Sequence, residues 1–290
     1  MKSILAILVL YRMSLAGSPT YRSLDKAMNE YPDVRGAIDL QVADNSAEAH
    51  EVPADFAGRY IHDGGNPGLA RRYNQALAAA TAGNTEWLLL LDQDTTLTPE
   101  YMQELLALSE ELVDRPEVVI ILPKLIVGER IYSPHPPRYL RARYKVERSS
   151  SGVLGSLLMG FNSAALVRVS ALNAIGGFPE AYWLDFLDHA TFTRLQRAGG
   201  RAYLMRASLM HDLSETNPKT ADTAATYART ENRLLAEERF YAEFGSLQER
   251  FLHRVDLLRQ FIGLGRRGKF LAAKLRLKFL LRTTVVPRTA

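Results

Sequence analysis

The chain has 290 residues, 47% of them hydrophobic and 23% charged, which is typical of a globular protein with one large domain or a domain plus an extension. It contains no cysteine, so disulfides, thiolate nucleophiles and cysteine zinc sites are excluded. No apolar run reaches the roughly 20 residues that span a bilayer. Arg12 interrupts the apolar start of the chain, which favours a buried first strand over a signal peptide.

Charge is distributed unevenly along the chain. Residues 251–290 hold ten Lys or Arg and one Asp, a net charge of +9. The other 250 residues hold 26 Lys or Arg and 31 Asp or Glu, a net charge of −5. This asymmetry indicates an anionic partner for the basic segment alone. We expect no nucleic-acid partner.

The first hundred residues alternate strand and helix patterns. Three apolar runs predict strands: 4–11, 37–44 and 87–91. Two intervening segments predict helices: 21–30 and 67–83. Strands separated by helices predict a mainly parallel sheet, whose ligands lie beyond the carboxyl ends of the strands. Each predicted strand ends in polar residues there: Tyr11-Arg12, Asp44-Asn45-Ser46 and Asp92-Gln93-Asp94.

The rest of the chain is less regular. A helix at 99–114 and a strand at 118–126 are followed by a Pro-, Arg- and Ser-rich segment, 132–152, that is typical of an exposed loop. We then expect a strand pair, a short helix ending at Gly176-Gly177, a helix at 188–199 and a last strand at 201–212. From Thr223 onward the pattern predicts helix to the end, and there is no internal repeat.

The strongest candidates for chemistry are Asp92 and Asp94. In an extended backbone, residues i and i+2 point to the same side, so the two carboxylates converge and their repulsion calls for a positive partner. Mg²⁺ and Mn²⁺ prefer oxygen ligands, which they often share between one or two carboxylates and a substrate diphosphate. A divalent cation is therefore one interpretation of the pair, and a solvated turn is the other.

Asp44 also admits two interpretations. It either forms an Asx-turn with its own backbone or accepts a hydrogen bond from a nucleobase imide. Downstream, GGNPGLARRYNQAL places free backbone N–H groups at a helix start, which suits an anion. The same segment supplies Arg71 and Arg72, although it lacks the Gly-Lys-Ser/Thr ending of a phosphate-binding loop.

The second half of the domain adds an imidazole and two acids. His211 follows an apolar strand and is either structural or part of a metal shell. Asp185 and Asp188 stand at a helix start after an aromatic pair. Acids in a first helical turn are ordinary partners of the helix dipole, and a carboxylate held there equally suits a general base.

Taken in order, these segments resemble glycosyltransferase family 2, in particular its bacterial rhamnosyltransferase-like branch. The resemblance covers roughly residues 1–232 and rests on a series of motifs: ADNS, NPGLARRYNQAL, LLLLDQDTTLTP, GFNSAALVRVSALNAIGGFPEAYWLDFLDHATFTRLQRAGG and LMHDLSE. It implies a GT-A fold, which is an α/β architecture with a Rossmann-like, mainly parallel sheet flanked by helices. We expect this domain at 1–222, with a nucleotide-binding half at 1–98 and an acceptor-binding half at 99–222. A basic helical region follows at 223–290.

The resemblance implies a role for each matching residue. Asp44 binds the pyrimidine, Asp92 the ribose side of the nucleotide, and Asp94 with His211 the Mg²⁺ or Mn²⁺ ion. Asp188 is the general base. The other residues implied for the nucleotide sugar are Tyr11, Asn66, Arg71, Asn74 and Gln93, and those for the acceptor are Trp183 and Asp185. The chain departs from the family pattern at Thr191, where a second acid is usual, and at Tyr11-Arg12, where Tyr-Asn is common.

The expected function is inverting transfer of a sugar, rhamnose by family analogy, from a dTDP- or UDP-sugar to a hydroxyl of a glycan or lipid-linked acceptor in cell-surface polysaccharide synthesis. We expect a cytoplasmic protein on the inner membrane face, with the basic segment either on anionic lipid or packed as a helical cap. A nucleotidyltransferase that makes nucleotide sugars is the alternative, but Tyr11-Arg12-Met13 lacks its glycine-rich signature. A non-catalytic carbohydrate- or membrane-binding scaffold is the third hypothesis: the intact acids and His211 oppose it, and Thr191 favours it.

Overall fold

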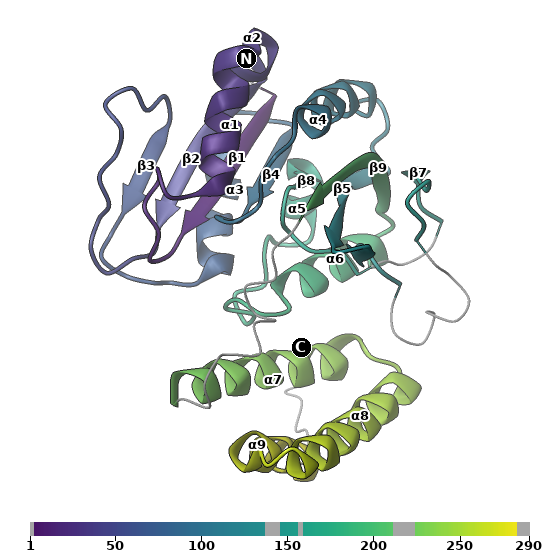
Figure 1. Ribbon diagram of the computed structural model, residues 1–290. Coiled ribbons are helices and arrows are strands. Elements are labelled where there is room, and N and C mark those ends of the chain that lie inside the picture. The colour runs from purple at the N-terminus through teal and green to yellow at the C-terminus, as the bar shows by residue number, and fades with distance from the viewer. Residues whose placement is uncertain (1–2, 137–145, 156–158, 211–223, 283–290) are drawn as a thin grey trace. The chain divides into compact units, whose positions relative to one another are not determined.

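The computed structural model describes residues 3–136, 146–155, 159–210 and 224–282 (Figure 1). The chain divides into two compact units, Met1–Asp212 and Leu213–Ala290. The first unit is the α/β body, and the second consists of helices.

The first unit is built on one sheet with the strand order β3-β2-β1-β4-β8-β5-β9-β7, and β6 pairs with β5 outside this path. Its strands are β1 (Ile4–Leu10), β2 (Ile38–Asp44), β3 (Arg59–His62), β4 (Trp87–Leu91), β5 (Val118–Val127), β6 (Arg130–Ser133), β7 (Gly152–Val153), β8 (Ala165–Arg168) and β9 (Arg201–Met210). Strands β3, β2, β1 and β4 are mutually parallel, as are β5 and β9. Strands β6, β7 and β8 run antiparallel to their neighbours. The predicted α/β architecture is confirmed.

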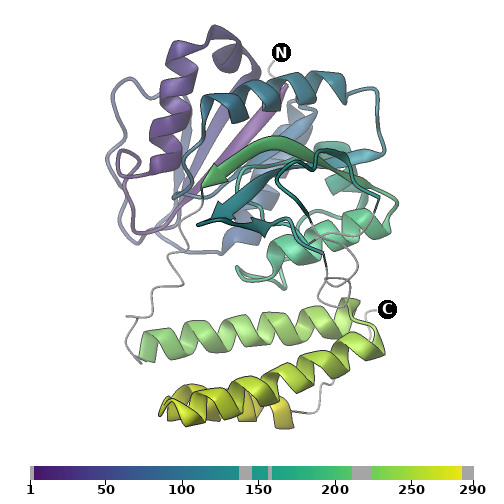
Figure 2. The same ribbon diagram turned by 45° about the vertical axis from the view of Figure 1, so that its right-hand side comes forward.

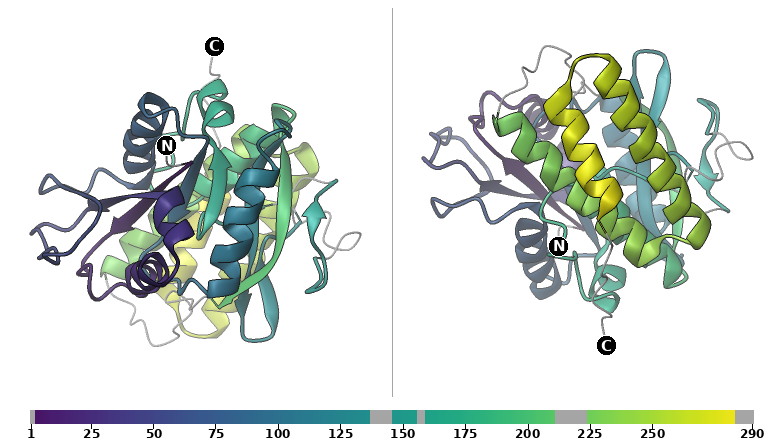
Figure 3. Two further views of the ribbon diagram at one scale, coloured as in Figure 1. Left: turned by 90° about the horizontal axis from the view of Figure 1, so that it is seen from above. Right: turned by 90° about the horizontal axis from the view of Figure 1, so that it is seen from below.

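Helices cover both faces of the sheet. The helices of this unit are α1 (Pro19–Glu30), α2 (Pro32–Ala37), α3 (Leu69–Ala82), α4 (Pro99–Glu111), α5 (Val169–Ala174) and α6 (Leu187–Arg197). Figure 3 shows α1 and α4 on one face and α3 and α5 on the other. All five residues of β4 are therefore buried, which explains why Trp87–Leu91 is apolar without alternation.

Local signals in the sequence set the helix starts. Ser18 and Thr98 cap α1 and α4 by accepting a hydrogen bond from the third following backbone N–H, and a proline opens each helix. Helix α4 also lies along β9 (Figure 2), where Glu104 accepts the backbone N–H groups of Arg206 and Ala207 at 2.8 and 2.7 Å. This carboxylate satisfies backbone donors at an irregularity in the β5–β9 pairing.

The register brings the predicted strand ends together. Leu10 of β1 lies opposite Asp44 of β2, and Leu8 of β1 lies opposite Leu91 of β4. The polar residues that follow these three strands therefore meet at one edge of the sheet, as the parallel pattern predicts.

Part of the expected topology is wrong. The strand pair expected after residue 152 does not form, because β7 pairs with β9 whereas β8 lies between β4 and β5. Strand β8 takes this central place because its residues are buried, and its one charged side chain, Arg168, is held by Glu86 and by backbone carbonyls. Helix α2 and strands β3 and β6 are additions that the apolar pattern does not predict.

The second unit contains α7 (Ala224–Phe244), α8 (Leu247–Arg266) and α9 (Phe270–Leu281). The expected C-terminal helices are therefore present. Four fully buried side chains form its core: Leu234, Leu257, Leu275 and Phe279. Arg254 joins the helices by donating to Glu238 on α7 and to the Leu280 carbonyl on α9. None of the described helices combines the length and hydrophobicity needed to cross a bilayer.

Candidate active site

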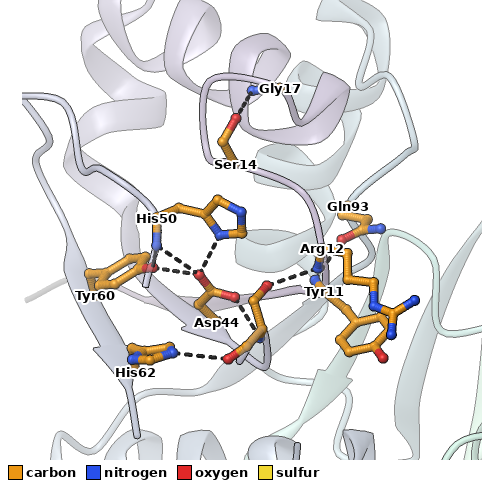
Figure 4. A network of polar contacts seen from close by, with 10 residues as sticks. Tyr11, Arg12, Ser14, Gly17, Asp44, His50, Tyr60, His62 and Gln93 are labelled. Atoms are coloured by element: carbon orange, nitrogen blue, oxygen red, sulfur yellow. Dashed lines mark hydrogen bonds and ion pairs between the residues drawn. The ribbon is translucent and has the colours of Figure 1, made fainter. Parts of the chain in front are cut away.

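Backbone and side-chain hydrogen bonds join the three strand ends (Figure 4). The N–H of Tyr11, just after β1, donates to Gln93 Oε1 at 2.8 Å, and the N–H of Arg12 donates to Ser46 Oγ at 2.8 Å. Gln93, expected to bind the nucleotide sugar, thus also holds the loop after β1. The Tyr11 ring remains 43% exposed at this edge, with the Arg12 guanidinium 5.0 Å from its centre.

Asp44 is fully buried and is surrounded by hydrogen-bond donors. Its Oδ1 accepts the Ser46 N–H at 2.8 Å, which is the Asx-turn geometry. Its Oδ2 accepts from Tyr60 Oη at 2.6 Å and from His50 Nδ1 at 2.7 Å (Figure 4). Burial is the strongest single influence on the pKa of Asp44 and raises it, but the hydrogen bonds from Ser46, Tyr60 and His50 together outweigh burial and lower the pKa to about 2.

Asp92 is held quite differently at the end of β4. Its Oδ2 accepts a hydrogen bond from Ser163 Oγ. Its Oδ1 is buried and accepts no hydrogen bond from any described residue. A buried carboxylate oxygen without a donor is costly, so this atom is suited to a donor or cation that a ligand brings.

Tyr73 on α3 connects Asp92 with Asp188. The Tyr73 side chain is buried, and its hydroxyl oxygen accepts from Asn162 Nδ2 at 2.9 Å. Burial first, and then the negative charges of Asp92 and Asp188, raise the pKa of Tyr73 well above its usual value. Both carboxylates, 96 residues apart in the sequence, therefore act on one neutral hydroxyl.

Asp188 lies in the first turn of α6, where the helix dipole favours a carboxylate. Its Oδ1 accepts the backbone N–H of His189 at 2.7 Å. Asp185 lies outside the helix, because Phe186 is the N-cap and adopts a left-handed φ of 63°. The two acids therefore do not share a helical face.

The segment before α6 is attached to the start of α3. The Leu69 N–H donates to the Trp183 carbonyl at 2.8 Å. The Trp183 ring lies against Gly68, where an added Cβ would come within 2.3 Å of Trp183 Cδ1. Trp183 nevertheless remains 46% exposed.

Asn74 makes a second attachment between these segments. It accepts the Phe178 N–H at 2.8 Å and donates to the Phe178 carbonyl at 2.9 Å. Gly177 has a φ of 80°, and a Cβ there would lie 2.7 Å from Asn74 Oδ1. In the structure, Asn74 thus holds the turn before Trp183, a role distinct from the nucleotide contact that the sequence suggests.

The remaining predicted donor-site residues lie at the start of α3. Asn66 Oδ1 accepts the Gly68 N–H at 3.2 Å. Arg71 is exposed, whereas its neighbour Arg72 is buried and donates to Asn45 Oδ1 and Asp63 Oδ1, both at 2.7 Å. Of the two arginines, Arg71 is therefore the one that is open to solvent.

The comparisons with known proteins bear on this site. Residues 40–176, from β2 to the turn after α5, match the family model described as glycosyl transferase family 2. Over these residues the chain is similar to glycosyltransferase family 2. The match includes Asp44, Asp92, Asp94 and the Ser163 partner of Asp92, and it supports sugar transfer as the general activity. No curated protein sequence matches the chain.

Solved structures of two other proteins are similar to this chain. Mannosyl-3-phosphoglycerate synthase from Rubrobacter xylanophilus matches with a TM-score of 0.50 and 14% identity, over 86% of this chain and 78% of that one. S. aureus TarS 1-349 matches with a TM-score of 0.48 and 14% identity, over 99% and 94% of the two chains. At this identity the similarity shows the fold alone, and the expected GT-A fold is confirmed.

The described residues provide part of a site for the divalent cation that the resemblance to glycosyltransferase family 2 implies. Asp94 is half-buried in the turn two residues beyond Asp92. His211, the other expected ligand, lies outside the described residues. Within the described ranges, no group of three or more His, Cys, Asp or Glu side chains is arranged to hold a metal ion. The partnerless Asp92 Oδ1 and the Asp94 carboxylate are hard oxygen donors that fit Mg²⁺ or Mn²⁺ if a substrate diphosphate completes the shell.

Several residues of this candidate site could not be predicted from the sequence. Tyr60 belongs to the unpredicted strand β3, and His50 lies in the loop before it. Ser163 contacts Asp92 across 71 residues. The motif GFNSA, which contains Asn162 and Ser163, is the one signal that could have found the Asp92 and Tyr73 partners.

Proposed function

We propose that the protein transfers a sugar, with inversion at the anomeric carbon, from a nucleotide-diphosphate donor to a hydroxyl of a glycan or lipid-linked acceptor. The observation that carries this proposal is that the charges of Asp92 and Asp188, from two halves of the domain, both raise the pKa of the Tyr73 hydroxyl. One carboxylate ends a central parallel strand, where nucleotides bind in α/β sheets, and the other begins a helix in the acceptor half.

In the proposed reaction the acceptor oxygen attacks the anomeric carbon, and Asp188 takes the proton that this oxygen loses. The bond from the anomeric carbon to the diphosphate oxygen breaks, and the nucleoside diphosphate leaves with the bonding electrons. Asp92 holds the ribose side of the donor and Trp183 stacks on the acceptor. A bound divalent cation, held by Asp94, would neutralise the departing diphosphate.

The donor we propose first is dTDP-rhamnose, with UDP-sugars next, in synthesis of a cell-surface polysaccharide on the cytoplasmic face of the membrane. The proposed pyrimidine contact involves Asp44, whose carboxylate already accepts hydrogen bonds from the Ser46 N–H, from His50 Nδ1 and from Tyr60 Oη. The base therefore meets a preorganised acceptor rather than a free side chain. The exposed Tyr11 and Arg71 complete the proposed donor site with Asn66 and Gln93.

Calorimetric titration with dTDP and UDP, with and without Mn²⁺, tests this proposal. We expect the wild type to bind a nucleoside diphosphate more tightly with Mn²⁺, and Asp94→Ala to lose that metal-dependent gain while its thermal unfolding stays unchanged. If Asp94→Ala binds metal and diphosphate as the wild type does, the metal assignment is wrong. If the wild type binds no nucleotide, a scaffold is the better hypothesis.

We also propose that the second unit docks on an anionic membrane, as its basic charge suggests. Helix α8 carries a stripe of exposed apolar side chains, spaced by four, seven and four residues and thus on one helical face: Leu247, Phe251, Leu258 and Ile262. Exposed Arg259 and Arg266 lie on the same helix beside this stripe. Apolar insertion together with positive charge is the property of interfacial helices.

Vesicle flotation tests the docking proposal. We expect binding to vesicles that contain phosphatidylserine and little binding to purely zwitterionic ones. Because each buried Leu or Phe contributes about 1.5–3 kcal/mol, Phe251→Ser with Leu258→Ser should weaken binding at least tenfold. Val113→Ser, which removes an equally exposed apolar side chain from the first unit, is the control. Equal binding to both vesicle types, or to neither, contradicts the proposal.

A further inference from the structure

His189 follows Asp188 directly and is enclosed by aromatic rings. Its side chain is only 8% exposed. The imidazole stacks on Phe161, with ring centres 5.5 Å apart and planes 6° from parallel. The rings of His135 and Phe186 meet it nearly at right angles, at 6.0 and 5.3 Å. These contacts determine the plane of the His189 ring.

The polar contacts of His189 determine where its proton lies. Nδ1 is 3.2 Å from the Gly160 carbonyl oxygen and 3.2 Å from Asp188 Oδ1. A carbonyl oxygen can only accept, and so can an ionised carboxylate. Nδ1 therefore carries a hydrogen that it donates to the Gly160 carbonyl, and Asp188 Oδ1 lies at the same distance from Nδ1.

Asp188 consequently has two unequal oxygens. Oδ1 accepts the backbone N–H of His189 and lies 3.2 Å from its Nδ1. No interaction with a described residue engages Oδ2. The side chain is 16% exposed, so an approaching ligand can still reach it.

We propose that His189 is a positioning residue for the transfer reaction. It fixes the rotation of the Asp188 carboxyl group through Oδ1 and leaves Oδ2 as the oxygen that takes the acceptor's proton. The inference rests on the proposed function, in which Asp188 is the general base. It explains why an imidazole buried among aromatic rings lies beside a carboxylate at the start of α6.

Two amide substitutions separate positioning from simple packing. His189→Asn places an amide nitrogen near the position of Nδ1, whereas His189→Gln places it near Nε2. Both remove the aromatic ring, so each controls for the lost stacking. We expect His189→Gln to lower kcat about 10- to 100-fold with the donor KM unchanged, because the N–H beside the charged Asp188 Oδ1 is lost. His189→Asn should stay within a few-fold of the wild type.

Combining these changes with Asp188→Asn keeps the two proposals apart. In the Asp188→Asn background, His189→Gln should have no further effect on kcat, because the residues act as one unit. If Asp188→Asn retains turnover, the proposed function fails. If Asp188→Asn loses turnover but the two His189 variants are equally active, the function stands and the positioning role is overturned.

A measurement on the unaltered protein serves if a variant does not fold. In ¹⁵N-histidine NMR spectra at neutral pH, we expect the His189 Nδ1 resonance to be that of a protonated nitrogen, and to shift in Asp188→Asn. A His189 tautomer with its hydrogen on Nε2 alone would overturn the inference.

Discussion

Asp44 and Asp92 end the two strands that flank β1, yet their surroundings are opposite. Asp44 accepts hydrogen bonds at both oxygens from Ser46, His50 and Tyr60. Among the described residues, Asp92 has Ser163 as the partner of one oxygen and no partner for its other, buried oxygen. The donors around Asp44 stabilise the fold and fix the carboxylate that we propose to contact the pyrimidine. A carboxylate left partly unsatisfied costs stability and is retained where a ligand supplies what is missing.

The largest effect is expected at Asp188, which resembles Asp92 because only one of its oxygens is engaged. Asp188→Asn should lower turnover about 10²- to 10⁴-fold with nearly normal donor affinity, since an amide keeps the shape but accepts no proton. Steady-state kinetics with saturating donor measure this. Asp185→Asn is the matched control and should be milder. The assignment is wrong if Asp185→Asn proves the more damaging change.

The next largest effects are expected at the two strand ends: a loss of binding at Asp92 and a loss of stability at Asp44. Asp92→Asn should weaken nucleoside diphosphate binding about 10- to 100-fold and leave thermal stability unchanged or higher, because the charged oxygen has no protein partner to lose. Asp44→Asn should lower the free energy of unfolding, since its donors lose a charged acceptor. Calorimetry and thermal unfolding of both variants measure the pair of outcomes. The comparison breaks down if Asp92→Asn is the less stable of the two.

The lowered pKa of Asp44 makes the free energy of unfolding depend on pH. Its pKa in the folded protein, about 2, lies below the usual value near 3.8, so the ionised form favours folding. This stabilisation, about 2 kcal/mol, is fully present above about pH 5 and is lost progressively as the pH falls towards about 1, most of it by pH 2.5. Denaturant unfolding of the wild type at pH 5 and pH 2.5 should show the loss. Asp44→Asn should show a loss smaller by that amount, and an equal loss in both proteins would argue against the lowered pKa.

The smallest effect concerns the turn at Gly176-Gly177, which Asn74 contacts. Gly176 and Gly177 have nearly the same φ, 79° and 80°, but only at Gly177 does an added Cβ meet Asn74. Gly177→Ala should therefore destabilise the protein by about 1 kcal/mol more than Gly176→Ala. Chemical denaturation of the two variants tests this directly, and equal losses would show that Asn74 does not restrain the turn.

Only part of the contrast between Asp44 and Asp92 could be predicted from the sequence. Strand β4 and the shared edge of the three strand ends follow from apolar runs and the parallel pattern, because both signals are local. The hydrogen bonds that satisfy Asp44 could not be predicted in this way, because Tyr60 lies on a short, half-exposed strand without an apolar run. The left-handed Phe186, which excludes Asp185 from α6, is equally unpredictable, because only glycine signals such a conformation in a sequence.

The attachment of Trp183 and Phe178 to α3 has a consequence for engineering. A designer who wishes to change the proposed acceptor specificity would exchange the loop between Gly177 and Phe186, the proposed acceptor loop, for one from a related protein. That loop rests on Gly68 through the Trp183 ring and is hydrogen-bonded to Leu69 and Asn74. A grafted loop will keep its conformation only if the first two turns of α3 are transplanted with it, so the acceptor loop and the start of α3 form one exchangeable module.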